Sequence, residues 1–254
     1  MKYMKVALLI PSTSHGRNWA KFEETYLFRH TLKTFLITYN KEHEYKFFIG
    51  IDRGDHIYDK DEIKEQIQRM MSVMKNVTLE FIYMEGISKG HLTIMWNRLY
   101  DRALDEGYDY FFQCGDDIEF RTSNWVNDCI YTLEKNNNMG VTGPINNNAC
   151  ILTQTFVSRK HKELFSYYFP TEIINWCCDD WINDVYKRLG HFYPLQQHLC
   201  ENVGGQPRYN INNDAFFAAN IRQKMQTLRQ QCAQIVERDY VRTISKKNGI
   251  MNSV

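Results

Sequence analysis

Two adjacent carboxylates, Asp116 and Asp117, follow an apolar segment at residues 108–114 and a glycine, Gly115. In an open α/β sheet the ligand crevice lies at the carboxyl ends of the strands, so both acids are expected to reach it. Clustered carboxylates favour Mg²⁺ or Mn²⁺, and such an ion completes its shell with water and phosphate oxygens. The pattern therefore predicts a metal site for a diphosphate, although acids after a strand also serve as caps and turn residues.

The ends of two further predicted strands carry polar residues that suit a nucleotide. Asp52 can accept hydrogen bonds from a ribose or a base edge, or it can form only a local turn with Arg53 and Gly54. The loop after the first strand offers hydroxyls, backbone amides and a cation. Its candidate nucleotide-binding residues are Pro11, Ser12, Thr13 and Arg17. Three strand ends are thus expected to meet at one polar crevice.

A second acidic pair, Asp179 and Asp180, stands at the start of a predicted helix. The dipole at a helix N terminus stabilises the ionised form of a carboxylate. An ionised carboxylate that faces the crevice could remove the proton of an acceptor hydroxyl as a general base. One that faces solvent would be only a helix cap.

Several other side chains could contribute to such a site. His198 could complete the metal shell or contact a diphosphate, or it could be an ordinary polar residue. Three aromatic residues are candidate platforms for a sugar acceptor, with core packing as the equal alternative. They are Trp176, Trp181 and Tyr209.

The elements that must position these residues alternate between short apolar runs and longer stretches of helical period. Strands are expected at residues 5–11, 45–51, 77–84 and 108–114, and helices at 19–40, 61–74 and 90–106. This alternation predicts an α/β fold whose central sheet is mostly parallel and flanked by helices. Beyond residue 114 the pattern weakens, with strands expected near 139–143, 151–157 and 192–195 and a helix at 179–189. From Ala215 onward the pattern predicts one long helix or two shorter ones, rich in Arg and Lys; a solvated closing helix is favoured over a basic arm for a membrane surface or a phosphorylated partner.

Composition limits the class of protein. The 254 residues carry 31 Lys and Arg against 30 Asp and Glu, so no overall field attracts nucleic acid or anionic lipid. The seven cysteines form no CxxC pair, and we therefore expect reduced thiols. The apolar run Val6 to Ile10 is too short for a signal peptide or a membrane span, so a soluble, cytoplasmic protein without a transmembrane segment is expected.

Together these segments resemble the family 2-like glycosyltransferases, which have the Rossmann-like A-type (GT-A) fold. The resemblance covers roughly residues 5–200 and rests on motifs in the same order. Asp52 matches the nucleoside-binding position, and Asn97 lies on a helix like the one that precedes the family's metal motif. Asp116-Asp117 resembles that motif, and Asp179-Asp180-Trp181 is similar to the helix that supplies the base.

The resemblance implies a transferase that moves a sugar from a nucleotide-diphosphate donor, with UDP favoured, to a hydroxyl of a glycan, protein or lipid-linked acceptor. By it Asp116 would lie near the ribose or the metal's water shell, and Asp117 would bind Mn²⁺ or Mg²⁺, with Glu119 sharing that role. Asp180 would be the base, with Asp179 as second choice, and the reaction would invert the anomeric configuration.

The resemblance also implies a division of the chain. A glycosyltransferase domain at 1–213 would comprise a nucleotide-sugar part at about 1–120 and an acceptor part at about 121–213, followed by a helical extension at 214–254. Two alternatives stay open at this point. One is a nucleotidyltransferase or metal-dependent phosphohydrolase, because paired carboxylates with a metal also serve phosphoryl transfer. The other is an inactive module on the same fold that binds a nucleotide sugar or glycan.

Overall fold

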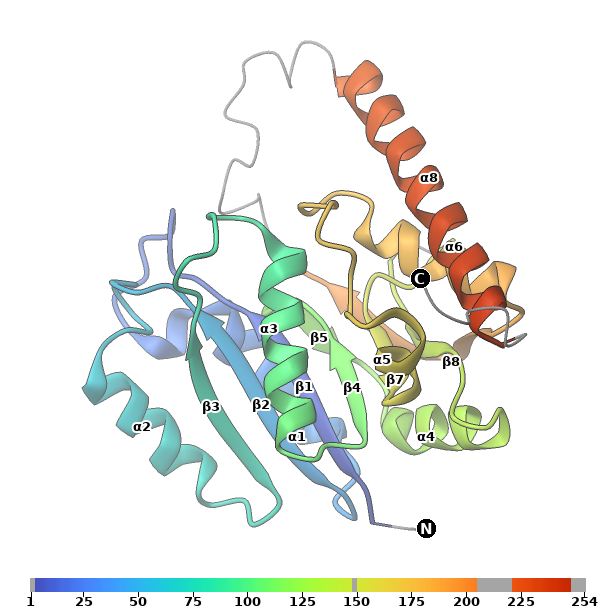
Figure 1. Ribbon diagram of the computed structural model, residues 1–254. Coiled ribbons are helices and arrows are strands. Elements are labelled where there is room, and N and C mark those ends of the chain that lie inside the picture. Colours follow the sequence, from blue (N-terminus) through green and yellow to red (C-terminus); the bar gives the residue numbers. More distant parts are fainter. Residues whose placement is uncertain (1–2, 148–149, 205–220, 248–254) are drawn as a thin grey trace.

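A computed structural model describes residues 3–147, 150–204 and 221–247, and Figure 1 traces their path. Its centre is an eight-stranded mixed sheet of order β3-β2-β1-β4-β7-β6-β8-β5. The strands are β1 Lys5–Pro11, β2 Glu44–Ile51, β3 Val77–Tyr83, β4 Tyr110–Gln113, β5 Ile118–Phe120, β6 Val141–Ile145, β7 Thr155–Ser158 and β8 Phe192–Asn202. The expected α/β class is confirmed.

The helices lie between and after these strands. They are α1 Lys33–Thr38, α2 Asp61–Met71, α3 Leu92–Asp105, α4 Trp125–Lys135, α5 Lys160–Phe165, α6 Cys178–Arg188 and α8 Ile221–Lys247. A 3-10 turn, Phe22–Glu24, and a π-helical turn, Leu27–Leu32, precede α1. The helix expected at roughly 19–40 is present over residues 27–38, where the π-helical turn runs directly into α1, and only the 3-10 turn stands apart from it.

The strand directions explain where a site can form. β1, β2, β3 and β4 are parallel, and β7 is antiparallel to both β4 and β6. β6 consequently points the same way as β4, and β8 runs parallel to β6. Six of the eight strands therefore end at one edge of the sheet, and the antiparallel β7 begins there. This edge is the expected crevice position in an open α/β sheet.

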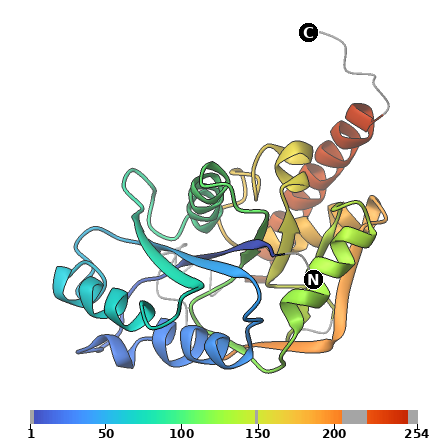
Figure 2. The ribbon, with the colours of Figure 1, turned by 90° about the horizontal axis from the view of Figure 1, so that it is seen from below.

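Two hydrophobic layers cover the sheet, and Figure 2 shows helices on both of its faces. Successive residues of β1 alternate between them, since side chains of a strand point to opposite faces. Leu8 belongs to the core cluster that includes residues of α1, α2 and α4, whereas Leu9 belongs to the one that includes residues of α3, α5, α6 and α8. The buried strands read as continuous apolar runs because both faces are covered.

The second half of the chain departs furthest from the expectations. α4, α5 and β5 were not predicted, and β8 extends to Asn202, far beyond the strand expected at 192–195. Helix α8 is not simply solvated: Cys232, Val236 and the carboxyl-bearing Asp239 on one of its faces are buried against the domain. Asp239 accepts hydrogen bonds from Trp181 Nε1 at 3.0 Å and from the Tyr167 hydroxyl at 2.8 Å. Among the described residues, no helix combines the length and apolar character needed to cross a membrane.

Candidate active site

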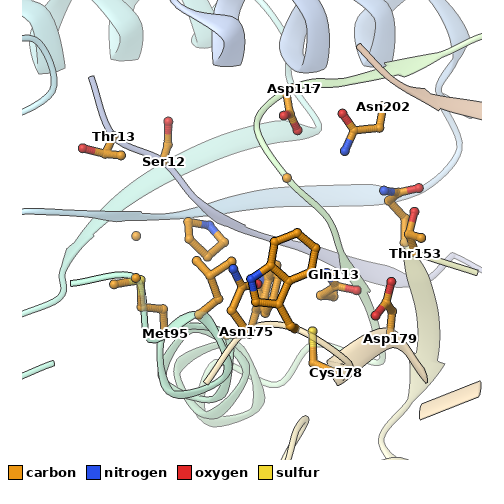
Figure 3. A pocket seen from close by; sticks show the side chains of 18 of the residues that line it. Ser12, Thr13, Met95, Gln113, Asp117, Thr153, Asn175, Cys178, Asp179 and Asn202 are labelled. Carbon is orange, nitrogen blue, oxygen red and sulfur yellow. The ribbon is translucent and has the colours of Figure 1, made fainter. Parts of the chain in front are cut away.

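A cavity of about 490 Å³ opens at the edge where the six strands end. Residues at the ends of β1, β2, β4, β6 and β8, residues just before β7, and the start of α6 all line it, and Figure 3 shows the polar side chains that face it. Met95 and Trp96 of α3 supply an apolar wall. A concave, partly apolar cavity with convergent polar groups is the usual form of a small-molecule site.

The loop after β1 is held by a buried carboxylate, Asp55. Asp55 accepts hydrogen bonds from the Thr13 hydroxyl at 3.0 Å, from the Ser14 backbone N–H at 2.8 Å and from the Ser14 hydroxyl at 2.5 Å. Burial alone would raise the pKa of Asp55, but the bonds from Ser14 and from the backbone N–H groups of Tyr58 and Ile57 lower it. The loop is therefore fixed before any ligand arrives.

One end of the cavity carries the polar groups predicted for a nucleotide. Pro11, Ser12, Thr13, Arg17 and Asp52 all line it, so the structure brings these five predicted residues together. Asp52 is buried, and its carboxylate forms an ion pair with Lys89 Nζ at 2.5 Å. The guanidinium of Arg17 lies 5.3 Å from the ring centroid of Tyr26.

The two residues of the first acidic pair, Asp116 and Asp117, lie in different environments. Asp116 is fully buried and accepts a hydrogen bond from the Ser12 hydroxyl at 2.6 Å, so it ties the end of β4 to the loop after β1. Asp117 instead lines the cavity. Its carboxylate lies between Gly115 and Gly204, where a Cβ on either glycine would overlap it. A side chain at either position would therefore displace the Asp117 carboxylate.

Glu119 and His198 are not brought to Asp117. Glu119 bonds to His30 Nδ1 at 2.6 Å and pairs with Arg121. Both ring nitrogens of His198 have partners, Thr122 Oγ1 at 3.1 Å and Asp128 Oδ2 at 2.7 Å. His198 stands four residues before the end of β8, about 13 Å along a strand, and neither residue lines the cavity.

Within the described ranges, no group of three or more His, Cys, Asp or Glu side chains is placed to hold a metal ion. The expected ligand set of Asp117, Glu119 and His198 is thus not assembled. A single carboxylate beside a diphosphate still fits Mg²⁺ or Mn²⁺, which keep several waters and are often held by one or two carboxylates and substrate phosphates. Asp117, which lines the cavity, is the carboxylate that would take such a role.

The two residues of the second acidic pair, Asp179 and Asp180, also differ in their position relative to the cavity. Asp179 lines the cavity, whereas Asp180, the first choice for the base, is not among the lining residues. Burial, then the nearby charge of Asp180, raises the pKa of Asp179 to about 6. Cys177, which precedes α6, adopts a left-handed conformation with φ of 74°, unusual for a residue other than glycine. This turn directs residues 175–179 along the cavity wall.

The residues predicted as aromatic platforms for an acceptor do not share one environment. Trp176 lines the cavity and is 44% exposed, so it is available at the rim. Trp181 is fully buried and bonded to Asp239, so it belongs to the core. Tyr209 lies outside the described residues.

Asn97 does not line the cavity. Its Oδ1 accepts hydrogen bonds from the backbone N–H groups of Tyr168 at 2.9 Å and Phe169 at 2.8 Å, and its Nδ2 donates to the Phe169 carbonyl at 2.8 Å. Asn97 therefore fixes the turn after α5 rather than contacting a ligand there.

Sequence reasoning missed a wall of side-chain amides that lies opposite the nucleotide end. The adjacent asparagines at 146 and 147 and the polar last residues of β4 and β8 were the available signal, but their meeting depends on the direction of β6, β7 and β8. The amide residues that line the cavity are Gln113, Asn146, Asn147, Gln154, Asn175 and Asn202.

Comparisons with known proteins agree with this architecture. No family model and no curated protein sequence matches the chain. Among solved structures, a mannosyltransferase from Pyrobaculum calidifontis, PcManGT, in complex with GDP-Man and Mn²⁺, is 12% identical with a TM-score of 0.56, and the match covers 100% of this chain and 77% of that one. These values show a shared fold.

Staphylococcus aureus TarS is similar in two forms. Its fragment 1–349 in complex with UDP-GlcNAc is 11% identical with a TM-score of 0.56, over 95% of this chain and 73% of that one. A longer TarS structure is 12% identical with a TM-score of 0.52, and the match covers 77% of this chain but only 36% of that chain.

Proposed function

We propose that this protein is a metal-dependent glycosyltransferase that uses a nucleotide-sugar donor. The observation that carries the proposal is the meeting of Asp117 and Asp179 in one cavity whose other end is lined by Ser12, Thr13 and Asp52. The shared fold with enzymes solved together with UDP-GlcNAc and with GDP-Man and Mn²⁺ supports it. UDP is the favoured nucleotide.

The donor would lie across the strand ends. Ser12, Thr13, Arg17 and Asp52 supply hydroxyls, a cation and a carboxylate for the nucleoside and its phosphates. The diphosphate would then reach Asp117, which would hold Mn²⁺ or Mg²⁺. When bound, this cation supplies positive charge to the departing diphosphate.

Asp179 is the better placed general base. At pH 7 a carboxyl group with a pKa of about 6 is mostly ionised, and it holds a proton more strongly than an ordinary aspartate does. It takes the proton of the acceptor hydroxyl while that oxygen bonds to the anomeric carbon, and the bond from this carbon to the diphosphate oxygen breaks. Attack from the face opposite the leaving group inverts the configuration.

The acceptor would approach past Trp176, whose exposed ring offers an apolar platform at the rim. A hydroxyl of a glycan, protein or lipid-linked saccharide satisfies this chemistry. On this proposal the nucleotide-sugar part, 1–120, contributes Asp117, and the acceptor part, 121–213, contributes Asp179 and Trp176.

The test measures nucleoside diphosphate release from a panel of UDP- and GDP-sugars with Mn²⁺. Wild type, Asp117→Asn and Asp179→Asn are compared with Asp184→Asn, a matched control that removes an exposed carboxylate of the same helix, α6. We expect release from wild type and the control, and a loss of at least 100-fold in the other two variants. Pyrophosphate as the product would indicate nucleotidyl transfer, and equal rates in all four proteins would refute the assigned roles.

A further inference from the structure

Gln113, the last residue of β4, lies on the wall of the cavity between the two acids (Figure 3). Its side chain is 3% exposed, which is unusual for a polar residue unless its hydrogen-bonding groups are used. The Thr155 hydroxyl donates a hydrogen bond to its Oε1 at 3.1 Å. With the oxygen held by Thr155, the amide NH₂ group is the part of the side chain left to face the cavity.

A buried chain of contacts fixes this orientation. The Tyr168 hydroxyl donates to the Thr155 carbonyl at 2.9 Å and lies 2.9 Å from the Thr155 hydroxyl. Asn97 in turn holds the backbone of Tyr168. Thr155 and Tyr168 are both fully buried, so packing holds in place the groups that support the amide of Gln113. Such supporting contacts are what a precise binding group requires.

The surroundings of Gln113 suit hydroxyl groups rather than a carboxylate. Asn202 and Thr153 lie along the same side of the cavity, between Asp117 and Asp179 in Figure 3. Amides and hydroxyls can both donate and accept, as sugar hydroxyls do. A sugar carboxylate at this place would lie near Asp179, which carries a negative charge at neutral pH and has no cation beside it in this proposal, and like charges that share a site repel.

We propose that Gln113 determines specificity by donating a hydrogen bond to the transferred sugar, and that this sugar is uncharged. A neutral hexose or N-acetylhexosamine fits, whereas a uronic acid is rejected. This inference rests on the proposed function, because it assumes that the diphosphate lies at Asp117 and the sugar beyond it.

The test measures binding by calorimetry in the presence of Mn²⁺, so that it does not depend on turnover or on the acceptor. UDP and GDP alone identify the preferred nucleotide. A matched pair of donors then differs only at C6: UDP-glucose with UDP-glucuronic acid, or GDP-mannose with GDP-mannuronic acid. Wild type is compared with Gln113→Met, which keeps the volume but removes the amide, and with Gln68→Met, an exposed site on α2.

Wild type should bind the hexosyl donor at least tenfold more tightly than the uronosyl donor. Gln113→Met should weaken the hexosyl donor by about tenfold, the usual effect of one lost hydrogen bond, and leave the nucleoside diphosphate within twofold of wild type. Gln68→Met should match wild type throughout. Gln113→Glu, which retains an acceptor for Thr155, provides the same test if Gln113→Met does not fold, and it should weaken the uronosyl donor by a further tenfold.

Two outcomes separate this inference from the proposed function. If the nucleoside diphosphate binds but the paired donors bind equally, or the Gln113 variants match wild type, only the role of Gln113 is overturned. If wild type binds neither nucleoside diphosphate nor donor, the proposed function fails and this inference fails with it.

Discussion

Replacement of Asp179 by asparagine should stabilise the fold at alkaline pH while it removes activity. The pKa of Asp179 is raised from an ordinary 3.8 to about 6, so its ionisation opposes folding. At about 1.36 kcal/mol for each pKa unit, the full shift corresponds to about 3 kcal/mol. Asp179 is partly buried rather than fully enclosed, so solvent reduces this cost, and a gain of about 1–3 kcal/mol is expected at pH 8.

The sign depends on pH. The folded-state pKa lies above the unfolded value, so the penalty is full above pH 6 and disappears as the pH falls below the unfolded value of 3.8. At pH 4 the difference in free energy of unfolding between variant and wild type should therefore shrink to about 0.5 kcal/mol at most. Asparagine retains an oxygen that can accept the 3.1 Å hydrogen bond from the Asp180 backbone N–H, so little packing is lost.

The assay is urea unfolding of both proteins at pH 8 and pH 4, together with nucleoside diphosphate release at pH 8. A gain confined to pH 8, with activity reduced at least 100-fold, fits a strained carboxylate that acts as the base. Equal stability at the two pH values, or the same gain at both, would refute the argument that charge burial is the cause. Retained activity would remove Asp179 as the base.

Three further variants test other contacts of the site. Asp180→Asn removes the neighbouring negative charge that helps to raise the pKa of Asp179. The variant should therefore keep its activity at pH 8, and the acid limb of its pH–rate profile should move to lower pH. Loss of activity at pH 8 would instead favour Asp180 as the base. Gly204→Ala should displace the Asp117 carboxylate and reduce Mn²⁺-dependent nucleotide binding at least tenfold in calorimetry, and unchanged binding would contradict the required close approach. Asp55→Asn should cost about 2 kcal/mol in urea unfolding at pH 7. Because the pKa of Asp55 is lowered in the fold, that cost should diminish as the pH falls below 3.8 and through the lower folded-state pKa, and a pH-independent cost would count against a charge effect.

Much of the first half of the fold could be predicted from the sequence because its signals are local. The apolar runs of β1, β2 and β3 and the helical spacing of α3 are each visible within a short window, and their alternation indicates parallel strands with covering helices. The loop residues Ser12 and Thr13 and the carboxylate Asp52 directly follow such strands, so their convergence also followed from the sequence. β8 was harder to recognise, because its polar stretch Gln196 to His198 resembles a loop.

Tertiary structure decided where the two residues of each acidic pair lie. Adjacent side chains point in different directions, and contacts with distant residues influence which of them faces the cavity. Ser12 holds Asp116 away from the cavity. The left-handed turn at Cys177 precedes Asp179, which lines the cavity. Side-chain partners likewise place Glu119 beside His30 and His198 beside Asp128.

The sequence by itself determined the layered α/β architecture, the edge of the sheet at which the cavity opens, and the acidic character of that edge, because periodicity and strand ends are properties of neighbouring residues. Only the tertiary structure decided which acid of each pair reaches the cavity and which amides face the two acids. The direction of β6, β7 and β8 brings Gln113, Thr153 and Asn202 to one wall, although they are far apart in the chain. The proximity of such distant residues depends on long-range pairing between strands, which cannot be read from a local sequence pattern.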